Sequence, residues 1–189
     1  MHLLKIVVFL SVIFSSTLCA VEIAFLKQFD ASGNPIVLVE NEAYSHVAIK
    51  VQNKWLHAIP YYGVILSDSL EPFGEVSFIL SNESIEEPGV HFLENVLGKK
   101  YFLFSDWNNF DEFNCTKLIG VFLDLEPKPL IIQESIWGHR FDQYKDRLGL
   151  SIGELQLQLN EQGYLQIEND SHLSNTDREE GHSCRKSLL

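Results

Sequence analysis

The chain has 189 residues, a length typical of one globular domain, and 46% of its residues are hydrophobic, which is enough for a packed core. Its formal net charge is −12, so a nucleic-acid phosphate backbone would repel it, and we expect no nucleic-acid binding. The sequence also has no polybasic segment of the kind that draws proteins to anionic lipid.

The first twenty residues have the pattern of a secretory signal peptide. Lys5 gives a positive charge, residues 6–14 are apolar, and the small and polar stretch that follows ends at Ala20. The apolar run is shorter than the roughly 20 residues that a membrane-spanning helix needs, which favours cleavage after Ala20 over an uncleaved anchor. The pattern predicts a periplasmic or secreted protein without stable membrane insertion after signal cleavage.

Alternating hydrophobic residues and turn signals predict a β-rich first half. Strands are expected at residues 21–27, 35–40, 45–51, 55–59, 64–66 and 75–80. Turns are expected at residues 31–34 and 52–54. In the third of these strands, Val47, Ile49 and Val51 share one face, and His46 lies on the other face with Ala48 and Lys50.

The second half has helical spacing. Helices are expected at residues 86–97, 115–123 and 151–160, and residues 137–148 are expected to be partly helical. Ser151 and Glu154 have the spacing of a capping box, which favours a helix start there. Residues 169–189 are polar and are expected to form a disordered C-terminal tail, which leaves residues 21–168 as one domain.

His46 and His57 are 11 residues apart and flank the expected turn at residues 52–54. If the turn closes with an even number of loop residues, the two histidines share a face of the sheet as diagonal neighbours. One imidazole could then act as a base while the other fixes its tautomer and orientation. With an odd loop and no bulge, the two would face opposite sides.

Cys115 begins the helix expected at residues 115–123. The partial positive charge at a helix N-terminus lowers a thiol pKa, and the main-chain N–H groups there could stabilise an oxyanion. Signal cleavage would leave Cys115 and Cys184, which could instead form a disulfide in an oxidising compartment. The polar surroundings of Cys184 favour a free Cys115. The acidic residues Asp106, Asp111 and Glu112 before it are expected to form a solvated loop.

Two groups of residues resemble the NlpC/P60 superfamily of papain-like cysteine hydrolases. Residues 45–51, 55–58 and 63–64 resemble its histidine half, in which a histidine opens a strand, a second polar residue precedes a small residue, and a Gly-Val step follows. Residues 114–119 resemble its cysteine helix, which follows an aromatic and acidic stretch, here residues 101–107.

The order of these groups resembles one branch of the superfamily. In ordinary members the cysteine precedes the histidines, whereas here Cys115 follows His46 and His57. The chain is therefore similar to the circularly permuted branch, which includes YiiX-like proteins and lecithin:retinol acyltransferase-like enzymes. Residues 148–155 are similar to a late helix start in YiiX-like sequences. YiiX-like members often have an acid in place of His57, and acyltransferase-like members have Glu-His-Phe where this chain has residues 116–118.

The resemblance implies an α+β papain-like NlpC/P60 fold in permuted order, with an antiparallel β-sheet packed against a cysteine-bearing helix. It implies an exported cysteine hydrolase of amide or ester bonds, in which Cys115 is the nucleophile, His46 the base and His57 the orienting residue. Peptidoglycan peptides are the expected substrate, followed by another peptide or an acylated small substrate, and no cofactor is needed. A glycan on the sequon at Asn114 would block the thiol, which favours a bacterial origin.

Other interpretations stay open at this point. The same fold could serve as a lipid or protein acyl-hydrolase or acyltransferase, or as a non-catalytic exported module that binds a peptide or glycan. His46, His57 and Cys115 are also zinc ligand types, although no fourth ligand is evident.

Overall fold

The computed structural model describes residues 20–167. The expected signal peptide lies outside this range except for Ala20, and the expected tail at residues 169–189, with Cys184, lies outside it entirely. Between residues 20 and 167, no helix is long and apolar enough to cross a membrane.

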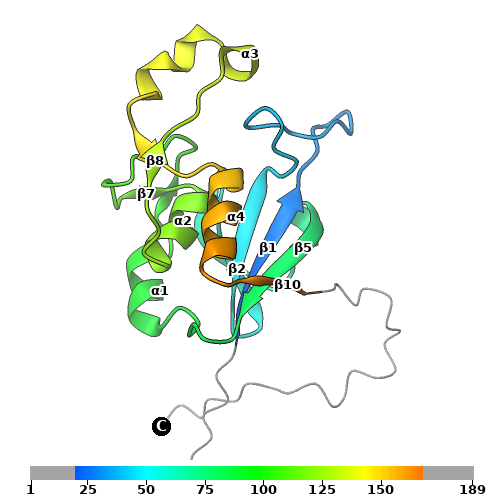
Figure 1. Cartoon of the computed structure of the whole chain (residues 1–189), viewed down its shortest axis with the longest axis vertical. Helices are drawn as coiled ribbons and strands as arrows, with labels where there is room; N and C mark the ends of the chain where they lie inside the picture. The colour runs from blue at the N-terminus through cyan, green and yellow to red at the C-terminus, as the bar shows by residue number, and fades with distance from the viewer. Residues whose placement is uncertain (1–19, 168–189) are drawn as a thin grey trace, which may run out of the picture.

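A six-stranded sheet runs through the centre of the protein, and each neighbouring pair of strands in it is antiparallel (Figure 1). The strand order is β10-β5-β1-β2-β3-β4. The strands are β1 (Val21–Lys27), β2 (His46–Val51), β3 (Lys54–Ile59), β4 (Gly63–Ser67), β5 (Glu75–Asn82) and β10 (Leu165–Ile167). Together with the helices described next, this sheet confirms the predicted α+β class.

The helices are short. They are α1 (Val90–Val96), α2 (Cys115–Phe122), α3 (Glu134–Trp137) and α4 (Ile152–Glu161), with 3₁₀ turns η1 (Glu71–Phe73) and η2 (His139–Tyr144). Two small ladders join the connecting segments: β6 (Lys100–Tyr101) pairs in parallel with β7 (Glu112–Phe113), and β8 (Lys128–Pro129) pairs with β9 (Leu148–Gly149). The predicted helices at residues 115–123 and 151–160 are confirmed to within one residue at each end.

The main core lies between one face of the sheet and the helices α2 and α4, which lie side by side over it in Figure 1. Its largest buried members include Phe25, Ile49, Leu56, Leu118, Ile119 and Leu155. A smaller apolar cluster of Ala24, Leu26, Ala48 and Leu70 covers the opposite face. The face assignment predicted for β2 is confirmed, because Val47, Ile49 and Val51 belong to the main core.

Side-chain caps explain where the two core helices begin. The Asn114 side chain accepts a hydrogen bond from the main-chain N–H of Lys117 at the start of α2. The Ser151 hydroxyl accepts one from the N–H of Glu154 at the start of α4, as the sequence predicts. Each cap satisfies a donor that the first helical turn leaves free.

The strand predicted at residues 35–40 is wrong. Phe29 and Pro35 form one isolated antiparallel bridge, and the chain then leaves the sheet. Asp30 closes a local turn by accepting hydrogen bonds from the main-chain N–H groups of Ser32 and Asn34. Pro35 has no N–H to donate, so this ladder cannot be extended in the usual way. The short edge strand β10 has no sequence pattern that predicts it.

Candidate active site

The two histidines meet in the hairpin formed by β2 and β3. Val51 pairs with Lys54, so the turn contains two residues, Gln52 and Asn53, and the even loop places His46 and His57 on one face. Extending this register sets the histidines diagonally across the two strands. His46 Nε2 lies 2.9 Å from His57 Nδ1, a hydrogen bond, which confirms the predicted pairing.

Both imidazoles are buried and neutral. Burial, together with the neighbouring His57, lowers the pKa of His46 to about 3, and burial lowers the pKa of His57 to about 4. The rings of His57 and Phe73 pack edge to face, with their centres 4.6 Å apart. His57 Nε2 is buried and has no hydrogen-bond partner. Because Nε2 of His46 is already bonded, Nδ1 is the nitrogen of His46 that is left for a proton transfer.

The sheet opens beside His46. The β2–β3 pairing ends at Ile49 and Leu56, although both strands continue beyond these residues. If the ladder went on, Val47 would pair with Ala58. The main-chain N–H of Val47 lies near enough to the Cys115 thiol to affect its pKa. The helix α2, which begins at Cys115, contacts both β2 and β3.

The Cys115 thiol is free and buried at the first position of α2. Burial raises its pKa to about 11, and the N–H groups of Val47, Thr116 and Cys115 itself oppose that rise. In this state the thiol is therefore protonated at neutral pH. The same three N–H groups would stabilise a thiolate, or the oxyanion that forms when the sulfur attacks a carbonyl carbon.

The structure joins two of the three predicted site residues, His46 and His57, and leaves Cys115 apart from them. The thiol lies near the N–H of Val47, the residue next to His46. The Cys115 side chain packs with the main core, whereas His46 and His57 lie on the opposite face of the sheet, and the open part of the hairpin lies between them. Among the described residues, the thiol has no hydrogen bond to either imidazole.

Tyr101 is a neighbour of the thiol that the sequence analysis did not single out. Burial raises the pKa of its hydroxyl, and negative charge at Cys115 raises that pKa further. Tyr101 lies on β6, which pairs with β7 just before α2. In the sequence, Tyr101 is marked only as part of an aromatic stretch before the cysteine. The parallel β6–β7 pairing that positions it joins segments more than one turn apart, so no local pattern reveals it.

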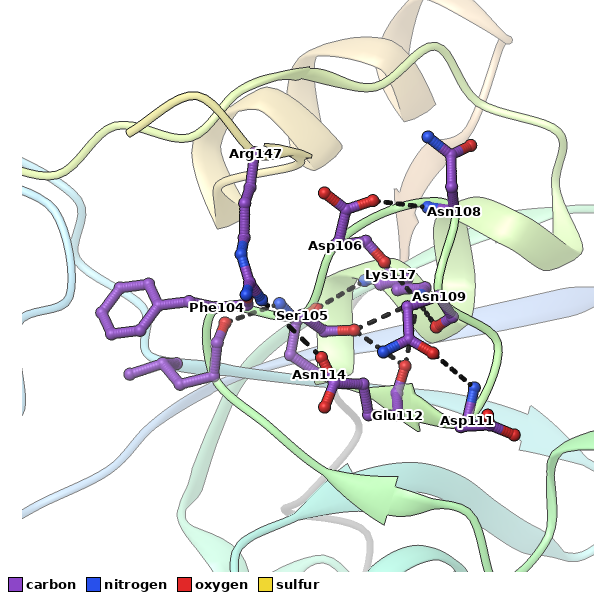
Figure 2. Close-up of polar contacts among 11 residues, drawn as sticks. Phe104, Ser105, Asp106, Asn108, Asn109, Asp111, Glu112, Asn114, Lys117 and Arg147 are labelled. Carbon is purple, nitrogen blue, oxygen red and sulfur yellow. Dashed lines mark hydrogen bonds and ion pairs between the residues drawn. The ribbon is translucent and has the colours of Figure 1, made fainter. Parts of the chain in front are cut away.

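Lys117 is the second residue that sequence reasoning missed. Its buried ammonium donates to Ser105 Oγ at 3.1 Å and to the main-chain oxygens of Asp106 at 2.6 Å, Glu112 at 2.9 Å and Asn109 (Figure 2). Burial lowers the pKa of Lys117 to about 8. The segment expected to be a solvated loop is therefore wrapped around a lysine two residues after the cysteine.

Asn114 has a structural role. Its side-chain N–H₂ donates to the carbonyl of Leu103 at 2.8 Å, and its oxygen accepts from Lys117 N–H and the Thr116 hydroxyl. The side chain is buried, which removes it from the surface where a glycan could be attached.

Two hollows lie near the site. A cavity of about 60 Å³ is lined by Cys115 together with Asn114, Thr116, Glu42 and mainly apolar side chains. A larger groove of about 710 Å³ lies on the histidine face, lined by Ile59, Tyr62, Ile65 and Phe73 among others, and does not include the thiol. The smaller cavity is the candidate substrate site, because Cys115, the candidate nucleophile, lines it.

Neither a metal-binding group among the described residues nor a match to a known protein indicates what this site does. No group of three or more His, Cys, Asp or Glu side chains in the described part of the chain is arranged to hold a metal ion. Comparison with models of protein families, with curated proteins and with solved structures finds no match to this chain.

Proposed function

We propose that this protein is an exported cysteine hydrolase of amide or ester bonds with a papain-like fold in permuted order. The observation that carries the proposal is the bonded His46–His57 pair at the end of β2, next to Val47, whose N–H lies near the Cys115 thiol. A nucleophile, a base and a residue that orients the base are the parts needed for covalent acyl transfer.

The neutral state of the groups sets the order of proton transfers. In the proposed reaction, His46 comes within reach of the thiol through the open part of the β2–β3 hairpin. The thiol attacks the substrate carbonyl carbon, a carbon–sulfur bond forms, and the thiol proton moves to His46 Nδ1. For this transfer, His46 Nε2 carries a hydrogen that it donates to His57 Nδ1, which fixes the tautomer of His46. The N–H groups around the thiol favour the negative charge that develops.

The second half of the reaction returns the site to its starting state. The imidazolium of His46 gives its proton to the leaving amine or alcohol, and the bond between the carbonyl carbon and that group breaks. Neutral His46 then accepts a proton from water, which attacks the acyl-enzyme and releases the acid. The thiolate takes the proton back, so the cycle uses one water and needs no cofactor.

The proposed substrates are peptidoglycan peptides or similar amides, which an exported bacterial protein would meet. The signal-peptide pattern at residues 1–20 supports the export part of this proposal. The sequence interpretation and the position of α2 against the β2–β3 hairpin support the permuted papain-like arrangement.

Labelling with a thiol-directed probe tests the proposal. An electrophile that carries a peptide-like carbonyl, such as an acyl chloromethyl ketone, is expected to modify wild type and Cys184→Ser at one site and to leave Cys115→Ala unmodified. His46→Gln is expected to slow the reaction by about a hundredfold or more, which is the usual contribution of a general base. Equal labelling of wild type and Cys115→Ala, or a bond between Cys115 and Cys184, would contradict the proposal.

A non-catalytic module that binds a peptide or glycan is the second candidate. The observation in its favour is the raised pKa of the Cys115 thiol together with the missing hydrogen bond between the thiol and His46. On this account, Cys115→Ala would bind a peptidoglycan fragment as tightly as the wild type, and neither protein would cleave it.

A further inference from the structure

The cavity that Cys115 lines has walls from two segments that are distant in the sequence. One wall belongs to the connection between β1 and β2, which contributes Leu38 and Val39. Another belongs to the segment between β8 and β9, which contributes Ile131 and Trp137. The cavity is about 60 Å³, which holds a few water molecules but not a peptide. A substrate can therefore reach the thiol only after one of these walls moves.

The connection between β1 and β2 is fixed at its two ends and loosely built between them. At one end the main-chain N–H of Ile36 donates to the Gln28 carbonyl at 2.9 Å, and at the other the N–H of Ser45 donates to the Leu26 carbonyl at 3.0 Å. Residues 37–43 belong to no helix or strand, and none of their side chains is buried. A segment with few buried contacts opens at a low cost in free energy, so this wall is the one that can move.

The segment around α3 holds residues 37–43 in place through two side chains. Trp137, the last residue of α3, donates from Nε1 to the main-chain carbonyl of Leu38 at 2.9 Å. Gln133, the residue before α3, accepts a hydrogen bond on Oε1 from the main-chain N–H of Glu40 at 2.5 Å. These bonds join segments more than 90 residues apart in the chain, across the cavity that contains the thiol.

A third side-chain bond ties the same segment to α4. The Ser151 hydroxyl donates to Glu42 Oε1 at 2.5 Å. A typical hydrogen bond shifts an opening equilibrium by about two- to tenfold. Three such bonds keep residues 37–43 closed most of the time without locking them there.

We infer that residues 37–43 are a lid over Cys115, which opens to admit the substrate and which Gln133, Trp137 and Ser151 hold closed. This inference rests on the proposed function for what enters the site, whereas the opening itself needs no catalysis. The closed lid keeps water and stray electrophiles away from the thiol. The open lid joins the cavity to solvent along the wall that Leu38 and Val39 form.

The rate at which iodoacetamide alkylates Cys115 tests the lid in the full-length protein, with peptide mapping to read the label at that residue. Gln133→Ala and Trp137→Phe each remove one closing bond, and phenylalanine keeps an aromatic ring against Phe104. Each variant is expected to react about two- to tenfold faster than wild type, and the double variant by about the product of the two factors. Trp55→Phe, the same exchange on the other face of the sheet, is expected to react at the wild-type rate.

Urea distinguishes the opening of the lid from unfolding of the whole protein. Below the unfolding transition, alkylation of Cys115 is expected to depend only weakly on urea, because opening residues 37–43 exposes little surface. A wild-type rate in the double variant, an equal acceleration in Trp55→Phe, or a urea dependence as steep as that of global unfolding overturns the lid.

The lid and the proposed function fail in different measurements. If the lid is overturned while an acyl chloromethyl ketone still labels Cys115 and His46→Gln still slows that labelling, the proposed function stands. If the ketone does not label Cys115 while iodoacetamide still reacts faster in the lid variants, the lid stands and the proposed function is overturned.

Discussion

Two buried polar clusters flank the start of α2, and they differ in how completely their hydrogen bonds are made. Around Lys117, the ammonium meets four oxygen acceptors from one loop. In the histidine pair, one hydrogen bond is made, and His57 Nε2 is buried without a partner. Saturated clusters hold a structure together, whereas unsatisfied buried groups persist where they serve another purpose.

The comparison assigns different consequences to the two clusters. Removing Lys117 should damage the fold and with it the site. Removing a histidine should damage the chemistry and leave the fold largely intact. The predictions below test this difference, beginning with the largest expected change in stability.

Lys117→Met is expected to lower the free energy of unfolding by about 3–5 kcal/mol, because the buried oxygens of the surrounding loop lose their cation. Urea unfolding measures the change. Lys128→Met is the control, since that side chain is exposed and only pairs with Glu126 at the surface. Similar stabilities for the two variants would contradict a structural role for the Lys117 cluster.

Acid should destabilise the protein through the histidine pair. Below about pH 6.5 the unfolded imidazoles bind protons, whereas the folded ones stay neutral down to about pH 4 for His57 and about pH 3 for His46. Stability contributed by the neutral pair is therefore fully present above pH 6.5 and is lost as the pH falls. We expect a loss on the order of 4 kcal/mol by pH 5, about 2 kcal/mol from each histidine.

Thermal unfolding of wild type and of the double variant His46→Gln, His57→Leu at pH 7 and pH 5 measures this contribution. The double variant should lose clearly less stability between the two pH values, because it lacks the two buried imidazoles whose protonation favours the unfolded state. A parallel decline of both proteins would mean that the histidines are not buried in the neutral form.

Asn114→Ala is expected to cost about 1–2 kcal/mol, because α2 loses its side-chain cap. Its buried bond to the Leu103 carbonyl is lost as well, which places the effect toward the upper end of that range. Chemical denaturation measures the loss. The control is Asn160→Ala, which changes an exposed side chain near the end of α4. An unchanged midpoint would show that the cap does not hold the cysteine helix.

His57→Leu should lower stability at pH 7 by only about 1–2 kcal/mol. His46 Nε2 loses its partner, but leucine removes the unpaired Nε2 and fills a similar volume against Phe73. The same variant should lose reactivity with a peptide-like electrophile, because nothing then fixes the tautomer of His46. A stability loss as large as that of Lys117→Met would remove the distinction between the two clusters.

Local patterns predicted much of this fold. The strands β1, β2, β3 and β5 followed from alternation, and α4 followed from its capping serine. Whether the turn after Val51 would hold an even number of residues, and so set the two histidines on one face, stayed open until the register was known. These features depend on residues close in the sequence. The failed strand at residues 35–40 had enough apolar residues but no partner strand to continue the ladder past Pro35.

The remaining parts of the site have no local sequence pattern. The approach of Cys115 to Val47 joins elements tens of residues apart. The loop around Lys117 joins residues only 5 to 12 positions apart, but no periodic pattern marks it, and none marks the end of the β2–β3 ladder at Ile49. Glu42 accepts a hydrogen bond from Ser151, which lies 109 residues later in the chain. Residue types and spacing could nominate Cys115, His46 and His57, but they could not supply the neighbours Tyr101, Lys117 and Glu42.

Acyl transfer from p-nitrophenyl acetate tests the central claim most directly. In wild type, intact-mass analysis with peptide mapping should find an acetyl group on Cys115, together with a burst of nitrophenolate followed by slower turnover. His46→Gln should slow the burst by about a hundredfold while keeping its melting temperature at pH 7. An equal burst in wild type and His46→Gln, or acetylation at another residue, would contradict the account.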